Sequence, residues 1–315
     1  MPIFFSRQFS RNSRAVLFIL WLFIVSGPLF AQDYQAKMER SDWYVSSSIF
    51  ECSLVHDVPR YGQGIFYHEA GEALSFYTSA VSNPMAEGKA ALVIEASNWR
   101  PGQAIRDLGY VRVRDGERPL IVETKRARHM IDGLMDGMKP TFTRKAWFSD
   151  EAMRVSLNSI NFNKAYQGFR SCEASLLPVN FRQVERTKVL FEVDKARLLA
   201  RDINTLDNLI TYVKADSTVT SIFVDGYTDS SGRKIYNRKL SKKRAEVVTK
   251  YLMDAGLDQT IIQTRYHGER YPIAENNSTT NKAKNRRTTV RLEKGVRRIM
   301  GDVQDDTSPV TTANN

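Results

Sequence analysis

The chain has 315 residues, and its formal net charge is +11 at pH 7. This length suits two domains. A basic excess is typical of proteins that bind nucleic acid or another anionic surface. An N-terminal export signal excludes nucleic acid as a partner, because an exported protein rarely meets any. Cell-wall carboxylates and lipid phosphates remain as anionic partners; alternatively, the lysines of the long C-terminal helix only keep its outer face solvated.

Residues 1–31 have the pattern of a secretory signal peptide. Three arginines and no acidic residue precede the apolar run 15–25, and a Ser-Gly-Pro sequence at 26–28 closes that run. The run is shorter than the ~20 apolar residues that span a bilayer, and no cysteine follows it to carry a lipid. We therefore expect cleavage near Ala31 and a periplasmic protein that does not span the membrane after cleavage.

Cys52 and Cys172 are the only cysteines of the chain. An even pair in an exported protein predicts a disulfide. The spacing of the pair fits neither a metal site nor a Cys-x-x-Cys redox motif. The bridge would close a long loop, which chain-entropy arguments value at roughly 4–5 kcal/mol. It would also tie the start of the first domain to its end.

The segment 32–180 is predicted to be an antiparallel β-rich domain with little helix, because its short apolar runs alternate in polarity between turn residues. The chain shows no catalytic constellation here: His56, His68 and His129 are scattered without the spacing of metal ligands. We therefore predict no metal and no cofactor. The expected strands are 64–67, 73–77, 90–96, 109–114 and 119–124, and the expected helices are 127–137 and 150–159.

The segment 187–295 follows a polar linker and alternates strands with helices. This alternation predicts a βαβαβ domain in which helices cover one face of a mixed sheet, so the fold class of the whole chain is α+β. The tail 300–315 is polar and is predicted to be disordered. The expected strands are 189–193, 220–226, 261–267 and 288–292, and the expected helices are 198–213 and 234–255, with Gly256 as the cap of the second.

Arg244 is the only charged side chain in the apolar arc of the predicted helix 234–255, when the helix is projected at ~100° per residue. A buried cation needs a counter-charge, and Asp229, at the end of the preceding strand, is the nearest candidate. Two interpretations stay open. The pair is either a half-buried salt bridge between strand and helix, or a receptor in which Asp229 binds an ammonium group and Arg244 a carboxylate.

The C-terminal domain resembles the OmpA-like peptidoglycan-binding domain family over residues 189–293. Its motifs stand here as Gly226-Tyr227-Thr228-Asp229, Gly232, Tyr236-Asn237, Leu240-Ser241, Arg244-Ala245, Gly268-Glu269, Pro272, Asn276 and Asn285-Arg286-Arg287. Tyr266, Asn281-Lys282 and Thr288 depart from the family pattern. The resemblance implies that Asp229 and Arg244 hold the diaminopimelate of the peptidoglycan stem peptide. It implies a site made of Thr228, Asp229, Asn237, Leu240, Arg244 and Arg287.

The region Cys52–Phe66 resembles the start of the MotY family of flagellar motor proteins, through Cys52-Ser-Leu-Val-His-Asp-Val-Pro59, Tyr61-Gly62 and Phe66. The resemblance implies that the N-terminal domain joins the ring proteins of the basal body and contacts the stator complex, while the C-terminal domain binds the cell wall. The expected function is a non-enzymatic periplasmic tether at the flagellar basal body. The alternative is a general link between envelope and peptidoglycan without a motor role. A wall hydrolase would need a pair of carboxylates or a zinc triad, and no spacing supplies either.

Overall fold

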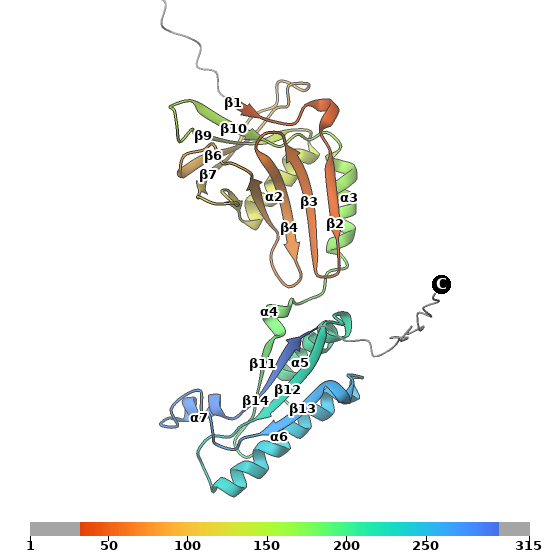
Figure 1. Cartoon of the computed structure of the whole chain (residues 1–315), viewed down its shortest axis with the longest axis vertical. Coiled ribbons are helices and arrows are strands. Elements are labelled where there is room, and N and C mark those ends of the chain that lie inside the picture. Colours follow the sequence, from red (N-terminus) through yellow and green to blue (C-terminus); the bar gives the residue numbers. More distant parts are fainter. Residues whose placement is uncertain (1–31, 296–315) are drawn as a thin grey trace, which may run out of the picture. The chain divides into compact units, whose positions relative to one another are not determined.

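The computed structural model describes residues 32–295, so the predicted signal peptide and the predicted tail lie outside the described residues. The described chain forms two compact units (Figure 1). The first holds residues 32–46, 53–67 and 74–171, and the second holds residues 172–295 with the segments Ser47–Cys52 and His68–Ala73. Between residues 32 and 295 no helix is both long enough and apolar enough to cross a bilayer.

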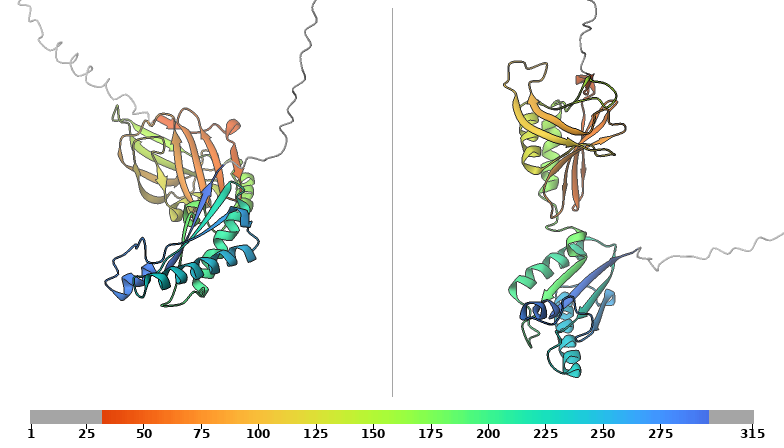
Figure 2. Two further views of the ribbon diagram at one scale, coloured as in Figure 1. Left: turned by 60° about the horizontal axis from the view of Figure 1, so that its bottom comes forward. Right: turned by 90° about the vertical axis from the view of Figure 1, so that its left-hand side faces the viewer.

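The N-terminal strands form two five-stranded sheets (Figures 1 and 2). Their orders are β1-β10-β9-β6-β7 and β2-β3-β4-β5-β8. Most of the paired strands are antiparallel, as predicted, and β1 runs parallel to β10. The strands are β1 (Gln32–Tyr34), β2 (Trp43–Ser47), β3 (Glu51–Val58), β4 (Gly62–Glu69), β5 (Ser75–Ala80), β6 (Gly88–Glu95), β7 (Arg106–Val113), β8 (Ile121–Val122), β9 (Lys139–Lys145) and β10 (Ala152–Ser156).

Aromatic side chains form the centre of the N-terminal core. Phe76 of β5 lies 4.9 Å from Phe66 of β4 and 5.8 Å from Phe142 of β9, measured between ring centroids. The second contact joins the two sheets. Trp43 of β2 meets Phe162 of α3 (Phe162–Glu173) edge to face at 4.8 Å, and α2 (Thr124–Met135) packs against β9 and β5. Buried aromatic rings contribute much of the stability of such a core because each removes a large apolar area from water.

The predicted helix 150–159 is wrong, because this segment contains the strand β10. Met153 and Val155 are fully buried while Arg154 is less so, which is the period of two of a strand with one face in the core. The strand also pairs with β9 along its whole length, and such pairing overrides weak local helix propensity. The helix that the chain does form is α3, and its Phe162 and Phe169 are buried at helical spacing.

The predicted disulfide between Cys52 and Cys172 is present. It joins β3 to α3 over a Cα–Cα distance of 6.0 Å and a sequence separation of 120 residues. No free cysteine remains among the described residues.

The C-terminal sheet has the order β11-β14-β12-β13, with β12 and β13 parallel and the other pairs antiparallel. The mixed sheet is as predicted. The elements of this part of the chain are α4 (Phe181–Val184), β11 (Arg186–Leu190), α5 (Ala200–Ala215), β12 (Val219–Gly226), α6 (Lys234–Asp254), the 3-10 turn η2 (Gln259–Ile261), β13 (Ile262–Tyr266), α7 (Thr279–Asn285) and β14 (Arg287–Lys294). A further 3-10 turn, η1 (Met38–Arg40), lies in the N-terminal part.

The helices α5 and α6 pack on one face of this sheet. Val224 of β12 and Val290 of β14 share a buried cluster with Leu206 of α5 and Val248 of α6. Side chains of neighbouring residues in a strand point to opposite faces. From Ile222 onward, after a register shift between Val219 and Ser221, the even-numbered residues of β12 face the helices, as do those of β14. Odd-numbered residues such as Phe223 and Arg291, which stack on each other at 4.4 Å, face away.

Asp216 connects the end of α5 to the last strand. Its Oδ2 accepts hydrogen bonds from the Tyr212 hydroxyl at 2.7 Å and from Lys294 Nζ at 2.8 Å. Its Oδ1 accepts from the backbone and the hydroxyl of Thr218. Burial alone raises the pKa of Asp216, but the bonds from Lys294, Thr218 and Tyr212 outweigh it and hold the pKa well below its usual range.

This arrangement predicts how stability depends on pH. A carboxylate whose folded pKa lies below its unfolded pKa, about 3.9, stabilises the fold above that value, and the contribution is lost as pH falls toward the folded pKa. We expect Asp216→Asn to lower the free energy of unfolding at neutral pH, with a gap to wild type that shrinks below about pH 4. Urea unfolding across this pH range measures the gap.

The matched control is Asp254→Asn, which removes an exposed partner of Lys250 and should change little at any pH. A gap for Asp216→Asn that keeps the same size down to the lowest pH would contradict the assignment.

Candidate functional site

A cavity of about 220 Å³ opens where β12 ends and α6 begins. The loop between these elements forms one wall, and the chain just after β11 forms another. Five of the six residues of the predicted binding site meet here: Thr228, Asp229, Asn237, Leu240 and Arg244. The other lining residues are Val193, Asp194, Ser231, Gly232, Tyr236 and Arg286.

Arg244 is fully buried, and its guanidinium binds three backbone carbonyls. Its Nε donates to Lys195 O at 2.9 Å, Nη1 to Tyr227 O at 3.0 Å and Nη2 to Glu192 O at 3.0 Å. A guanidinium has five N–H donors, so two are left for a ligand in the cavity. Burial and the neighbouring cation of Arg286 lower the pKa of Arg244 to about 10, against the opposing field of Asp229; the group is therefore charged at neutral pH.

Of the two interpretations that the sequence left open, the direct salt bridge between Asp229 and Arg244 is not formed. Asp229 pairs with Arg286 instead: its Oδ2 lies 3.0 Å from Arg286 Nη1, and its Oδ1 accepts from Ser231 N at 2.9 Å. Arg286 is further fixed by Nε, which donates to Phe191 O at 3.1 Å. Carbonyls of Glu192 and Lys195, in the loop before α5, and of Tyr227, just after β12, take the place of the expected carboxylate beside Arg244. Helix projection could not predict the first two, because they come from a segment distant in sequence.

Arg287, the remaining predicted site residue, does not line this cavity. Its guanidinium stacks on the Tyr227 ring at 3.9 Å and donates to Tyr271 O at 3.0 Å. Arg286 takes the place in the cavity that the sequence analysis gave to Arg287. The register of β14 contained the signal: Val290 faces the helices, so an even-numbered arginine lies on the side of Arg244.

Several motif residues hold the loops of the site and do not face a ligand. Gly226 lies against α6 so closely that a Cβ would come within 2.1 Å of Ser241 O. The Ser241 hydroxyl accepts from Gly268 N at 2.9 Å. Asn285 Oδ1 accepts from the backbone of Ile273 and Ala274. The family pattern therefore consists partly of scaffold residues.

Asn237 and Thr228 set the polar character of the cavity. Asn237 Nδ2 donates to Asp229 O at 3.3 Å and to Glu269 Oε2 at 2.6 Å, so it fixes the loop that carries Asp229. Thr228 Oγ1 is buried and has no hydrogen-bond partner in the described chain. Buried hydroxyls are normally satisfied, so this one is available to a ligand.

The mouth of the cavity adds an acidic and an aromatic side chain. Asp194, whose φ is +56°, accepts a hydrogen bond from the Tyr236 hydroxyl. Both side chains are exposed. The cavity thus has two cationic side chains at its base and carboxylates at its wall and mouth, an arrangement that fits a zwitterionic group. In the described residues no group of three metal-ligating side chains comes together.

Comparison with known proteins gives two family matches. The MotY N-terminal domain matches residues 34–178, and the OmpA family matches residues 190–286. The sodium-type flagellar protein MotY of Vibrio parahaemolyticus is 30% identical over 266 residues, which cover 82% of this chain and 89% of that protein. Outer membrane protein A of Bordetella avium is 35% identical over 115 residues, or 36% of this chain and 59% of that protein.

Among solved structures, the peptidoglycan-associated lipoprotein from Burkholderia pseudomallei is similar to 34% of this chain and 90% of its own, with 26% identity and a TM-score of 0.33. The match to the Vibrio protein, in contrast, extends over both domains. The chain belongs to the MotY family, with an OmpA-family domain after its MotY N-terminal domain.

Proposed function

We propose that the chain is a non-enzymatic periplasmic component of the flagellar motor. Its C-terminal domain binds peptidoglycan, and its N-terminal domain joins the stator complex and the ring proteins of the basal body. This proposal has a wall-binding half and a motor half. The observation that supports the wall-binding half is the cavity that Arg244, Arg286 and Asp229 line together. Membership in the MotY family supports the motor half.

The ligand group that fits this cavity is the free end of diaminopimelate, a carbon that carries both an ammonium and a carboxylate. The carboxylate binds the remaining N–H donors of Arg244 and Arg286, because a guanidinium favours a planar anion. The ammonium binds Asp229. Each carboxylate oxygen of Asp229 accepts one hydrogen bond already, and an ionised carboxylate offers about four acceptor positions in all.

The mechanism is tethering, in which no covalent bond forms or breaks. One zwitterion in a cavity of this size supplies only a modest affinity. Anchoring that resists motor torque therefore needs several copies of the chain bound to one wall, since linked sites gain affinity by effective concentration.

The second candidate is a general link between envelope and peptidoglycan without a motor role. Proteins similar to this chain in the OmpA-family part alone are named as outer membrane proteins and lipoproteins. The MotY N-terminal domain at residues 34–178 favours the motor role over this candidate.

We expect Asp229→Asn to weaken binding of the mature chain to purified sacculi by about tenfold or more, because a charge-assisted hydrogen bond contributes about 1.5–3 kcal/mol. The change keeps the size of the side chain and an acceptor for Ser231 N. Co-sedimentation with sacculi measures binding, and a thermal melt checks that the domain is folded.

Asp225→Asn is the matched control. Asp225 is as buried as Asp229 and pairs with Arg265 at 2.7 Å and His267 at 2.8 Å, outside the cavity. We expect it to lower stability and leave sacculus binding intact. Equal binding by wild type and the Asp229→Asn variant, or equal losses in the two variants, would contradict the site.

If the chain is a motor component, it should be located at the flagellar base. We expect a fluorescent fusion of the full chain to form foci at the flagellar base, and these foci should disappear from a strain that lacks the basal body. An even distribution around the envelope, or foci that persist in that strain, would instead support the general link.

A further inference from the structure

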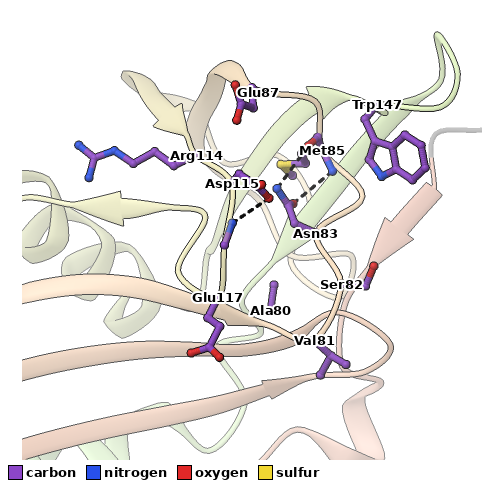
Figure 3. A pocket seen from close by; sticks show the side chains of 11 residues that line it. Ala80, Val81, Ser82, Asn83, Met85, Glu87, Arg114, Asp115, Glu117 and Trp147 are labelled. Carbon is purple, nitrogen blue, oxygen red and sulfur yellow. Dashed lines mark hydrogen bonds between the residues drawn. The ribbon is translucent and has the colours of Figure 1, made fainter.

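The first unit contains a cavity of its own, with a volume of about 600 Å³ (Figure 3). Three connections between strands form it: residues 81–87 between β5 and β6, residues 114–117 after β7, and Trp147 between β9 and β10. These connections are far apart in sequence and lie together in the fold. The peptidoglycan site uses none of them.

Apolar side chains stand exposed at this cavity on a fixed backbone. Val81 and Trp147, which line the cavity, are 93% and 70% exposed; Phe148, next to Trp147 in the chain, is 55% exposed. The rings of Trp147 and Phe148 meet edge to face at 5.2 Å. The backbone N–H of Val81 donates to Tyr61 O at 3.0 Å, and that of Trp147 to Pro84 O at 3.1 Å. Exposed aromatic side chains are typical of protein interfaces. Because hydrogen bonds already fix the backbone here, binding costs little further conformational entropy.

Hydrogen bonds and a β-bridge also fix the backbone at the floor of the cavity. Met85 is 2% exposed and forms a β-bridge with Ala146. The Asn83 side chain accepts from Met85 N at 3.2 Å and donates to Met85 O at 3.3 Å, as Figure 3 shows in part. Arg144 donates to the carbonyls of Ala86 and Glu87. The cavity is therefore preformed.

The charged groups at the cavity are mostly acidic. Glu87, Asp115 and Glu117 line it, whereas the chain as a whole has a net charge of +11. Within residues 32–295, none of these three carboxylates forms an ion pair. Arg114 also lines the cavity, and its guanidinium points away from the other lining side chains in Figure 3. Three carboxylates against one lining guanidinium favour a cation over anionic lipid or cell-wall carboxylates.

We propose that this cavity docks a segment of a partner protein in which a lysine or arginine stands next to an aliphatic side chain. The aliphatic group contacts apolar side chains of the cavity, Trp147 among them, and the carboxylates of Glu87, Asp115 and Glu117 attract the cation. The proposal deepens the motor half of the proposed function and rests on it for the compartment in which the partner is met. The wall-binding half is independent of this surface.

The test places a photoreactive benzoylphenylalanine at Val81 of the full chain, produced in its native flagellated cells. The matched control position is Tyr110 of β7, which is 67% exposed in the same unit and does not line the cavity. We expect the Val81 probe, and not the Tyr110 probe, to cross-link one protein, with mass spectrometry locating the attachment in a segment with a basic residue beside an aliphatic one. Attachment to lipid, to no protein, or to a segment without a basic residue overturns the proposal.

Two variants of the probe-bearing chain test the chemistry. Trp147→Ala removes the apolar contact, and Glu117→Lys reverses one charge. Each should lower the cross-link yield at least about tenfold, because aromatic and charged side chains are the contacts whose loss most weakens an interface. Glu39→Lys, at an exposed site of the same unit outside the cavity, should leave the yield unchanged. Equal yields in all three overturn the proposal.

Sacculus binding separates this proposal from the wall-binding half of the proposed function. Trp147→Ala and Glu117→Lys should bind sacculi as wild type does and should reduce swimming. If they bind sacculi normally and also swim normally, the docking proposal fails while the peptidoglycan site stands. If the Asp229→Asn variant binds sacculi as well as wild type does, the proposed peptidoglycan site is contradicted, and the docking proposal, which the cross-link tests, is not affected.

Discussion

One buried guanidinium determines the shape of the ligand-binding end of the C-terminal domain. Arg244, on the apolar side of α6, donates to carbonyls of residues 192 and 195 and of Tyr227. These carbonyls come from two segments that meet only in the folded chain. An unpaired buried cation is costly, so the fold is stable only when both segments close around it. The same side chain that joins the loops also lines the cavity, so the proposed binding would depend on a residue that the fold itself needs.

The other charged groups follow from this constraint. Three carbonyls bind Arg244, and Asp229 pairs with Arg286, which lines the same cavity. The base of the cavity then carries more positive than negative charge, which is the basis for the proposed binding of a ligand carboxylate. Scaffold residues such as Gly226 and Ser241 keep strand and helix close enough for the three charged groups to meet.

Periodicity predicted much of the fold and part of the site. The apolar arc of α6 identified Arg244 as buried, and alternation of strands and helices predicted the mixed sheet. Periodicity did not predict the partners of Arg244. Asp229 was the nearest candidate for a counter-charge, and a helix projection cannot show that backbone carbonyls of a distant loop take its place. The sequence analysis placed Arg287 in the site where Arg286 lies. The alternation of residues along β14 already puts even-numbered side chains on the side of Arg244, and it could have corrected this prediction. The sequence did not predict the strand β10, because this segment becomes a strand through its pairing with β9, a contact that local propensity does not show.

The central claim is that the cavity recognises a zwitterion. The direct measurement is displacement of the mature chain from sacculi by two synthetic stem tripeptides, one with meso-diaminopimelate and one with lysine in its place, which lacks the second carboxylate. We expect the diaminopimelate peptide to displace the chain at a concentration about tenfold lower, or lower still, than the lysine peptide needs, because only its second carboxylate can bind the donors of Arg244 and Arg286. Equal potency of the two peptides would contradict it.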